Sequence, residues 1–135
     1  MKYIGLSLLI ILVIACQPEK AQVEYDKPDV ALNEGERWVA NDATIEGIAR
    51  MESLVHDFSG DDYSALQENL RSEFQEIFKK CTMKGEAHEE LHAYLFPLME
   101  QFGALTQGSF EDRGEVLEKL KWYLGEFDTY FKAKD

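Results

Sequence analysis

The stretch CTMKGEAHEELHAYLFPLMEQF, residues 81–102, decides the fold because it joins a turn to a long helical pattern. One set of its positions recurs at intervals of three and four residues, which is typical of one face of an α-helix: His88, Leu91, Leu95, Leu98 and Phe102. Gly85 stands immediately before this segment and Pro97 lies inside it. We therefore expect a helix that begins after Gly85 and is kinked or cut short at Pro97.

Three other segments show the same spacing, and none shows the alternation of a strand. A first helix is expected from Asn41 or Asp42 to Ser59-Gly60, a second from Asp61 or Asp62, and a last over residues 112–131. Their predicted buried positions are Ile45, Ile48, Met51, Val55 and Phe58, then Tyr63, Leu66, Leu70, Phe74, Ile77 and Phe78, and finally Val116, Leu117, Leu120, Leu124, Phe127 and Phe131. Aromatic residues are spaced as core and need no ligand, among them Phe74, Phe78, Phe96, Trp122 and Phe127.

Four amphipathic segments with short connections predict an all-α fold, an antiparallel up-down-up-down four-helix bundle over residues 41–133. In that topology the first and third helices start, and the second and fourth end, at one pole. The 81–92 stretch is expected there, together with Trp38 and Tyr130. His56 is expected at the opposite pole.

The first residues, MKYIGLSLLIILVIACQPEK, have the layout of a secretory signal, with Lys2 before an apolar run that ends at Ala15. The run is shorter than the roughly 20 residues of a spanning helix. Val13-Ile14-Ala15-Cys16 resembles the lipobox of bacterial lipoproteins. The resemblance implies that residues 1–15 are a signal peptide, that Cys16 is lipidated, and that acyl chains anchor the protein to a membrane of the bacterial cell envelope. A plain signal peptide and an uncleaved anchor are the alternatives.

Residues 16–40 are polar, contain Pro18 and Pro28 and show no sustained period, which predicts an irregular tether. Its end, LNEGERWV, carries Leu32, Trp38 and Val39, so we expect a packed segment around Trp38.

The chain has 135 residues with 14 basic and 26 acidic side chains, a net charge of −12, which suits one domain. This charge repels phosphates, so no nucleic-acid partner is expected, and an incoming cation is attracted. If Cys16 carries lipid, Cys81 has no disulfide partner in the chain. Such a cysteine is usually buried, joined to another molecule, or bound to a ligand.

The 81–92 stretch predicts a metal site. Cys81 continues the apolar stripe of the second helix, while His88 and His92 are one helical turn apart and share a flank of the third. We expect Cys81, His88 and His92 to be ligands, with Met83 from the connecting loop as an auxiliary one. Sulfur and imidazole donors suit copper(I), and zinc is also possible. The expected role is metal storage, delivery or sensing.

Three alternatives to this site stay open. One is an interaction or scaffold module that binds another envelope protein without metal. Another is a b-type haem held by one His and one Met. Covalent attachment of haem is excluded because the sequence has no C-x-x-C-H motif. The third is a zinc hydrolase, because residues 88–92 match the H-E-x-x-H signature with Glu89 as the base and Glu111 or Glu115 as a nominal third ligand. We do not expect an enzyme; a Cys81 nucleophile paired with a histidine ranks below metal binding.

Two motifs together, LNEGERWVAND at 32–42 and CTMKGEAHEELHAYL at 81–95, give the chain a wider resemblance. The chain is similar to a group of small uncharacterised bacterial lipoproteins that pair an N-E-G-x-x-W segment with a C-T-M-x-G-x-x-H-x-x-L-H motif. The resemblance implies that five residues of the second motif form one unit, with Trp38 nearby: Cys81, Met83, Gly85, His88 and His92. It does not imply a particular ion.

Overall fold

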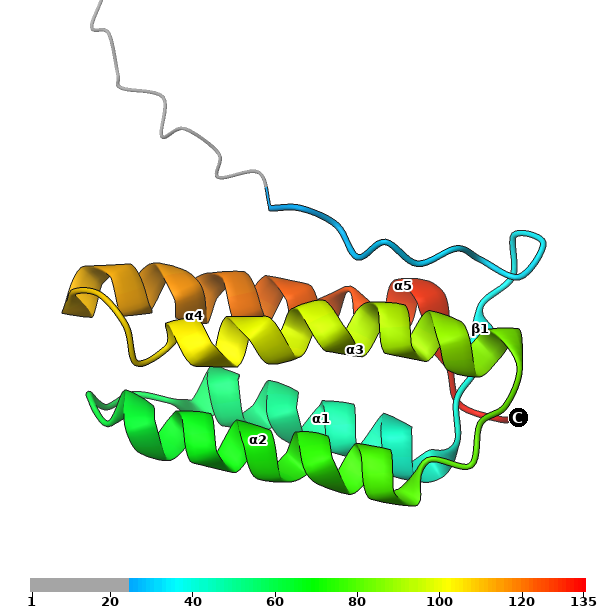
Figure 1. Ribbon diagram of the computed structural model, residues 1–135, viewed down its shortest axis with the longest axis horizontal. Coiled ribbons are helices and arrows are strands. Elements are labelled where there is room, and N and C mark those ends of the chain that lie inside the picture. Colours follow the sequence, from blue (N-terminus) through cyan, green and yellow to red (C-terminus); the bar gives the residue numbers. More distant parts are fainter. Residues whose placement is uncertain (1–24) are drawn as a thin grey trace, which may run out of the picture.

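The computed structural model describes residues 25–135. Four long helices make up most of this part of the chain (Figure 1). They are α1 (Asp42–Asp57), α2 (Tyr63–Lys80), α3 (Glu86–Ala104) and α4 (Phe110–Gly125). The predicted all-α four-helix bundle is therefore confirmed, and consecutive helices run in opposite directions in Figure 1. The signal peptide and Cys16 lie outside the described residues. Within residues 25–135 there is no helix long and apolar enough to cross a membrane.

Side-chain capping is seen at the starts of α2 and α4, whereas Asn41 at the start of α1 makes no side-chain capping hydrogen bond. The Asp62 carboxylate accepts a hydrogen bond from the Ala65 backbone N–H at 3.0 Å, as expected for the start of α2. At the start of α4, Ser109 and Asp112 form a capping box. Helix α3 continues past Pro97 to Ala104, so the proline does not cut the helix short.

The core lies between the four helices and is built mostly from the predicted stripes. The fully buried large side chains include Met51 of α1, Leu70 and Ile77 of α2, Leu91, Leu95, Leu98 and Phe102 of α3, and Leu120 and Leu124 of α4. Two of the expected core aromatics, Phe78 and Phe96, are instead exposed. Both line a groove on the outer face of α2 and α3 rather than the core.

The end of α4 differs from the prediction of a helix to Phe131. Helix α4 stops at Gly125 and is followed by the short helix α5 (Phe127–Tyr130) and the strand β2 (Phe131–Lys132). Strand β2 pairs in parallel with β1 (Trp38–Val39), with Trp38 opposite Phe131. The helical spacing of Phe127 and Phe131 reflects burial of both rings, which stack 4.8 Å apart, rather than one continuous helix.

Residues 25–37, expected to belong to an irregular tether, pack along α3 and α4 as a strap (Figure 1). The Tyr25 ring lies 5.4 Å from that of Trp122. The Trp38 indole N–H donates to the Ala31 carbonyl at 2.6 Å, and the Ala31 N–H donates to the Glu90 carboxylate at 2.8 Å. The strap is therefore fastened to the first half of α3, which carries the candidate site.

Two buried tyrosines join α3 to α4 through reciprocal hydrogen bonds. The Tyr94 hydroxyl donates to the Tyr123 carbonyl at 2.9 Å, and the Tyr123 hydroxyl donates to the Tyr94 carbonyl at 3.0 Å. Burial raises the pKa of both phenols above its usual value, so both hydroxyls stay protonated and able to donate.

We expect Tyr94→Phe to lower the free energy of unfolding by about 1 kcal/mol. The loss is limited because the Tyr123 carbonyl still accepts from the Glu126 N–H. Urea denaturation followed by circular dichroism measures the change. The control is Tyr130→Phe, which removes a half-buried hydroxyl without a hydrogen-bond partner in the described structure and should change stability little. Equal losses in the two variants would contradict the proposed hydrogen-bond contribution.

Candidate metal site

The α2–α3 turn, residues 81–85, brings the candidate ligands to one pole of the bundle. Cys81 caps the end of α2, and Gly85 stands at the start of α3 with a φ of 63°. This left-handed conformation suits glycine, and no other atom lies within 4 Å of the position that a Cβ would take there, so the requirement comes from the backbone alone. The Asn41 side-chain amide donates to the Lys80 carbonyl at 3.3 Å and ties the turn to the start of α1.

Two of the candidate ligands, Cys81 and His88, lie within contact distance of each other. The Cys81 Sγ lies 3.6 Å from the His88 Nδ1, and both side chains are half-buried. Cys81 follows the apolar stripe of α2 as its C-cap, and His88 lies in the first turn of α3. Thiol and imidazole thus converge across the turn.

His92 lies beside this pair, with its ring centroid 4.2 Å from that of His88. Its ring also stacks on Phe78 at 5.3 Å and lies 5.1 Å from that of Phe96. Burial, and secondarily the neighbouring His88 ring, lowers the pKa of His92. The lowered pKa favours the neutral imidazole, the form whose ring nitrogen can bind a cation.

Met83 comes from the same turn and packs, half-buried, against the edge of the core. Within residues 25–135, no three His, Cys, Asp or Glu side chains are grouped closely enough to hold a metal ion. The structure therefore brings Cys81 to His88 and His92 to His88, without a preformed cluster of three such ligands. The third donor to an ion held by Cys81 and His88 is either His92, after a movement of its side chain, or the thioether of Met83.

The H-E-x-x-H interpretation needs a third ligand besides the two histidines, and the structure places both nominated glutamates away from them. Glu90 accepts the hydrogen bond of the strap, and Glu89 is exposed in the first turn of α3. Glu111 and Glu115 lie in the first half of α4, at the pole opposite the histidines (Figure 1). Helix α3 has 19 residues and is about 28 Å long. Among residues 25–135 no three His, Cys, Asp or Glu side chains are grouped closely enough to hold a metal ion, so the structure does not bring Glu111 or Glu115 to the two histidines.

Trp38 lies at this pole, as expected, but its connection to α3 runs through residues of the strap. Its indole binds the Ala31 carbonyl, and Ala31 in turn binds Glu90, which lies between the two histidines on α3. The sequence reasoning missed the aromatic neighbours of His92, Phe78 and Phe96, because their helical spacing is the same as that of core residues.

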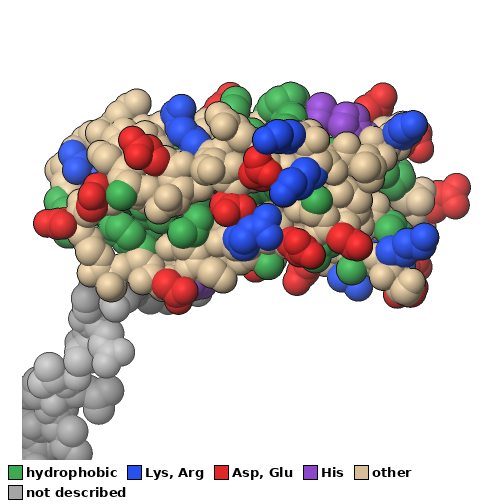
Figure 2. All heavy atoms as spheres, turned by 90° about the horizontal axis from the view of Figure 1, so that it is seen from below, with side chains coloured by type: hydrophobic (Ala, Val, Ile, Leu, Met, Phe, Trp, Pro, Cys, Tyr) green, Lys and Arg blue, Asp and Glu red, His purple; other side chains and the backbone are tan. Residues whose placement is uncertain are grey.

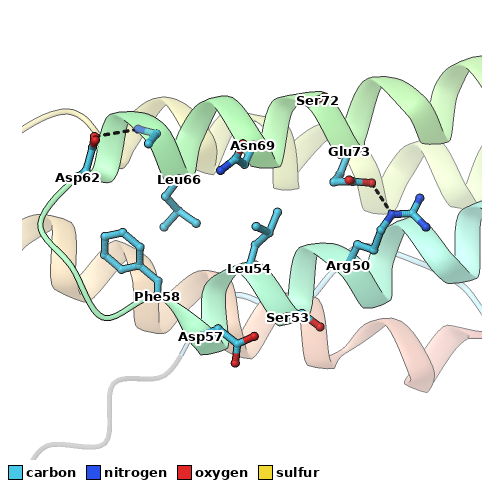
Figure 3. A pocket seen from close by; sticks show the side chains of 11 residues that line it. Arg50, Ser53, Leu54, Asp57, Phe58, Asp62, Leu66, Asn69, Ser72 and Glu73 are labelled. Carbon is cyan, nitrogen blue, oxygen red and sulfur yellow. Dashed lines mark hydrogen bonds and ion pairs between the residues drawn. The ribbon is translucent and has the colours of Figure 1, made fainter.

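A groove of about 650 Å³ lies elsewhere, between α1 and α2 (Figure 3). Leu54, Phe58 and Leu66 form its apolar floor, and hydrophobic side chains are visible in a hollow of this face in Figure 2. An ion pair between Arg50 and Glu73 at 2.6 Å bridges the two helices at one end. The described residues that line it include no thiol or imidazole, so it offers no soft metal ligand.

Comparison of the chain with protein-family models, with curated proteins and with solved structures gave no match.

Proposed function

We propose that the pole at the α2–α3 turn binds a soft transition-metal ion, copper(I) in preference to zinc. Cys81 and His88 are the principal ligands, His92 is the third, and Met83 is auxiliary. The proposed role is storage or delivery of the ion in the bacterial cell envelope, with the chain anchored through lipid on Cys16.

The separation of Cys81 Sγ and His88 Nδ1, 3.6 Å, is the observation that carries the proposal. In a tetrahedral zinc site, a zinc–sulfur bond of about 2.3 Å and a zinc–nitrogen bond of about 2.0–2.1 Å separate the two ligand atoms by about 3.6 Å. The observed separation therefore matches that of two ligand atoms bound to one ion.

The kinds of donor atom favour copper(I). Structural zinc sites almost always take four protein ligands, and the described residues near Cys81 do not present a ready set of that size. Thiolate and thioether are soft ligands that select copper(I), and imidazole also suits copper. The neutral state of His92 and the net charge of −12 both favour the approach of a cation.

The exposure of the site favours exchange of the ion over a structural role. Cys81 and His88 are half-buried rather than enclosed, so a partner or a chelator can reach them. The bundle also has its own continuous apolar core, and the ion is therefore not needed to hold the helices together.

We expect His88→Ala to weaken copper(I) binding at least tenfold, a loss of about 1.4 kcal/mol or more. The measurement is competition with a colorimetric copper(I) chelator under anaerobic reducing conditions, using the full chain, with Cys81→Ser as a second ligand variant. His56→Ala is the matched control, because His56 lies in the last turn of α1 at the opposite pole. Equal copper retention by His88→Ala, Cys81→Ser and His56→Ala would reject the site, and stronger retention of zinc than of copper(I) would change the assigned ion.

A further inference from the structure

The outer face of α2 and α3 exposes three large apolar side chains next to one another. Phe78, Phe96 and Met99 keep 37%, 48% and 44% of their surface accessible. With Phe74 they line a groove of about 560 Å³. The rings form a continuous surface, because Phe78 lies 5.0 Å from Phe74 and 6.2 Å from Phe96. A contiguous apolar patch of this kind on a folded protein usually marks an interaction site.

The charge of this groove is opposite to that of the chain as a whole. Its other lining residues are Arg71, Gln75 and Lys79, with no Asp or Glu, although the chain has 26 acidic and 14 basic residues. Arg71 forms no ion pair with any residue in 25–135. Lys79 contacts Glu76 at 3.2 Å, but its side chain is largely exposed, so this pair is held weakly. The groove is therefore apolar with a basic rim.

The chemistry of the groove indicates its occupant. Phe, Met and Arg are the residues enriched at the centre of protein interfaces, and a groove between two helices accepts the apolar face of a third. Arg71 and Lys79 are eight residues apart on α2, which corresponds to about 12 Å, or slightly more than two helical turns. A bilayer of anionic lipid is disfavoured as the occupant because the chain carries a net charge of −12.

We propose that the α2–α3 groove docks an amphipathic helix of a partner protein, apolar on one face and carrying acidic residues about two turns apart. Acidic side chains of the partner pair with Arg71 and Lys79, while its apolar side chains cover Phe78, Phe96 and Met99. The docked helix lies next to the candidate metal site, because Phe78 and Phe96 both contact the His92 ring. Figure 2 shows exposed hydrophobic side chains beside histidine side chains along one edge of the molecule.

The test begins with selection of a displayed library of random helical peptides on the purified full chain. Selected peptides are synthesised with a fluorescent label, and their dissociation constants are measured by anisotropy. We expect apolar residues at intervals of three and four, and acidic residues about two turns apart. Phe96→Ser and Met99→Ser should each weaken binding at least tenfold, because exposed apolar anchors dominate such interfaces.

Charge and position are tested separately. Arg71→Glu should weaken binding several-fold, and a peptide with one acidic residue replaced by lysine should recover it on that variant. Phe110→Ser is the matched control, because Phe110 is 62% exposed at the start of α4, outside the groove, and its loss should leave binding unchanged. Cys81→Ser should also bind the peptide normally, so that failure of the metal proposal and failure of this one are distinguishable.

Four results would overturn the proposal. They are failure to select any peptide, selection of peptides without acidic residues, undiminished binding by both Phe96→Ser and Met99→Ser, and binding of phosphatidylglycerol vesicles that depends on Phe96 and displaces the peptide. Circular dichroism and the thermal midpoint of each variant establish that the bundle is intact. This is expected for the exposed positions Arg71, Phe96, Met99 and Phe110, and the same measurement checks the half-buried Cys81.

Discussion

Replacing Phe102 with alanine lowers the free energy of unfolding by about 3–5 kcal/mol. Phe102 is fully buried in α3, and its ring meets that of Phe74 edge-on at 5.7 Å. Truncation removes the buried ring and leaves a cavity that close-packed neighbours cannot fill. Chemical denaturation of the full chain, followed by circular dichroism, measures the loss.

The matched control for this substitution lies six residues earlier on the same helix. Phe96 is the same residue type, but about half of its surface is exposed. We therefore expect Phe96→Ala to change the free energy of unfolding by no more than about 0.5 kcal/mol. Similar losses in Phe96→Ala and Phe102→Ala would contradict the arrangement in which one ring belongs to the core and the other to the surface.

Replacing Gly47 with alanine destabilises the bundle by about 1–3 kcal/mol, although alanine is the better helix former. A Cβ at this position lies within 2.4 Å of the Ile77 Cγ1 and 2.8 Å of its Cδ1. Ile77 is almost fully buried, so its side chain has little room to move away. The added methyl group therefore pushes α1 away from α2 or forces Ile77 out of its preferred rotamer.

The steric origin of this effect is tested by a double-mutant cycle. In an Ile77→Ala background the obstructing atoms are absent, so Gly47→Ala should become neutral or stabilising. Gly114→Ala is the control, because Gly114 lies in α4 with no atom within 4 Å of an added Cβ. It should stabilise the bundle by about 0.5–1 kcal/mol. Stabilisation by Gly47→Ala in the unmodified chain would refute the close contact between α1 and α2.

Helical periodicity was a sound guide to the middle of each apolar stripe and a poor guide to its edges. Ile77 and Leu70 are at the centre of the α2 stripe, and both are buried as predicted. Phe78 follows Ile77 directly in the sequence but lies about 100° further round the helix. Whether such a position is covered depends on how far the neighbouring helix extends, and the residues of one helix contain no information on that distance.

Contacts between segments far apart in the chain could not be predicted from the sequence either. The β1–β2 pairing joins Trp38 to Phe131, and two-residue strands have no recognisable alternation of their own. The strap is joined to α3 by the backbone N–H of Ala31, which donates to the Glu90 carboxylate 59 residues away in the sequence. Contacts of this kind join segments far apart in the chain, and local residue patterns do not encode them.

Residue spacing alone was enough to predict the four helices, most of the core, and the presence of Cys81, Met83, His88 and His92 near one turn, because spacing along a helix sets which residues share a face. The packed bundle was needed to establish that the Cys81 sulfur and a His88 nitrogen lie at a separation suited to a shared ion, and that Phe78 and Phe96 remain uncovered. These separations depend on the relative placement of α2 and α3, which is set by packing of the whole core.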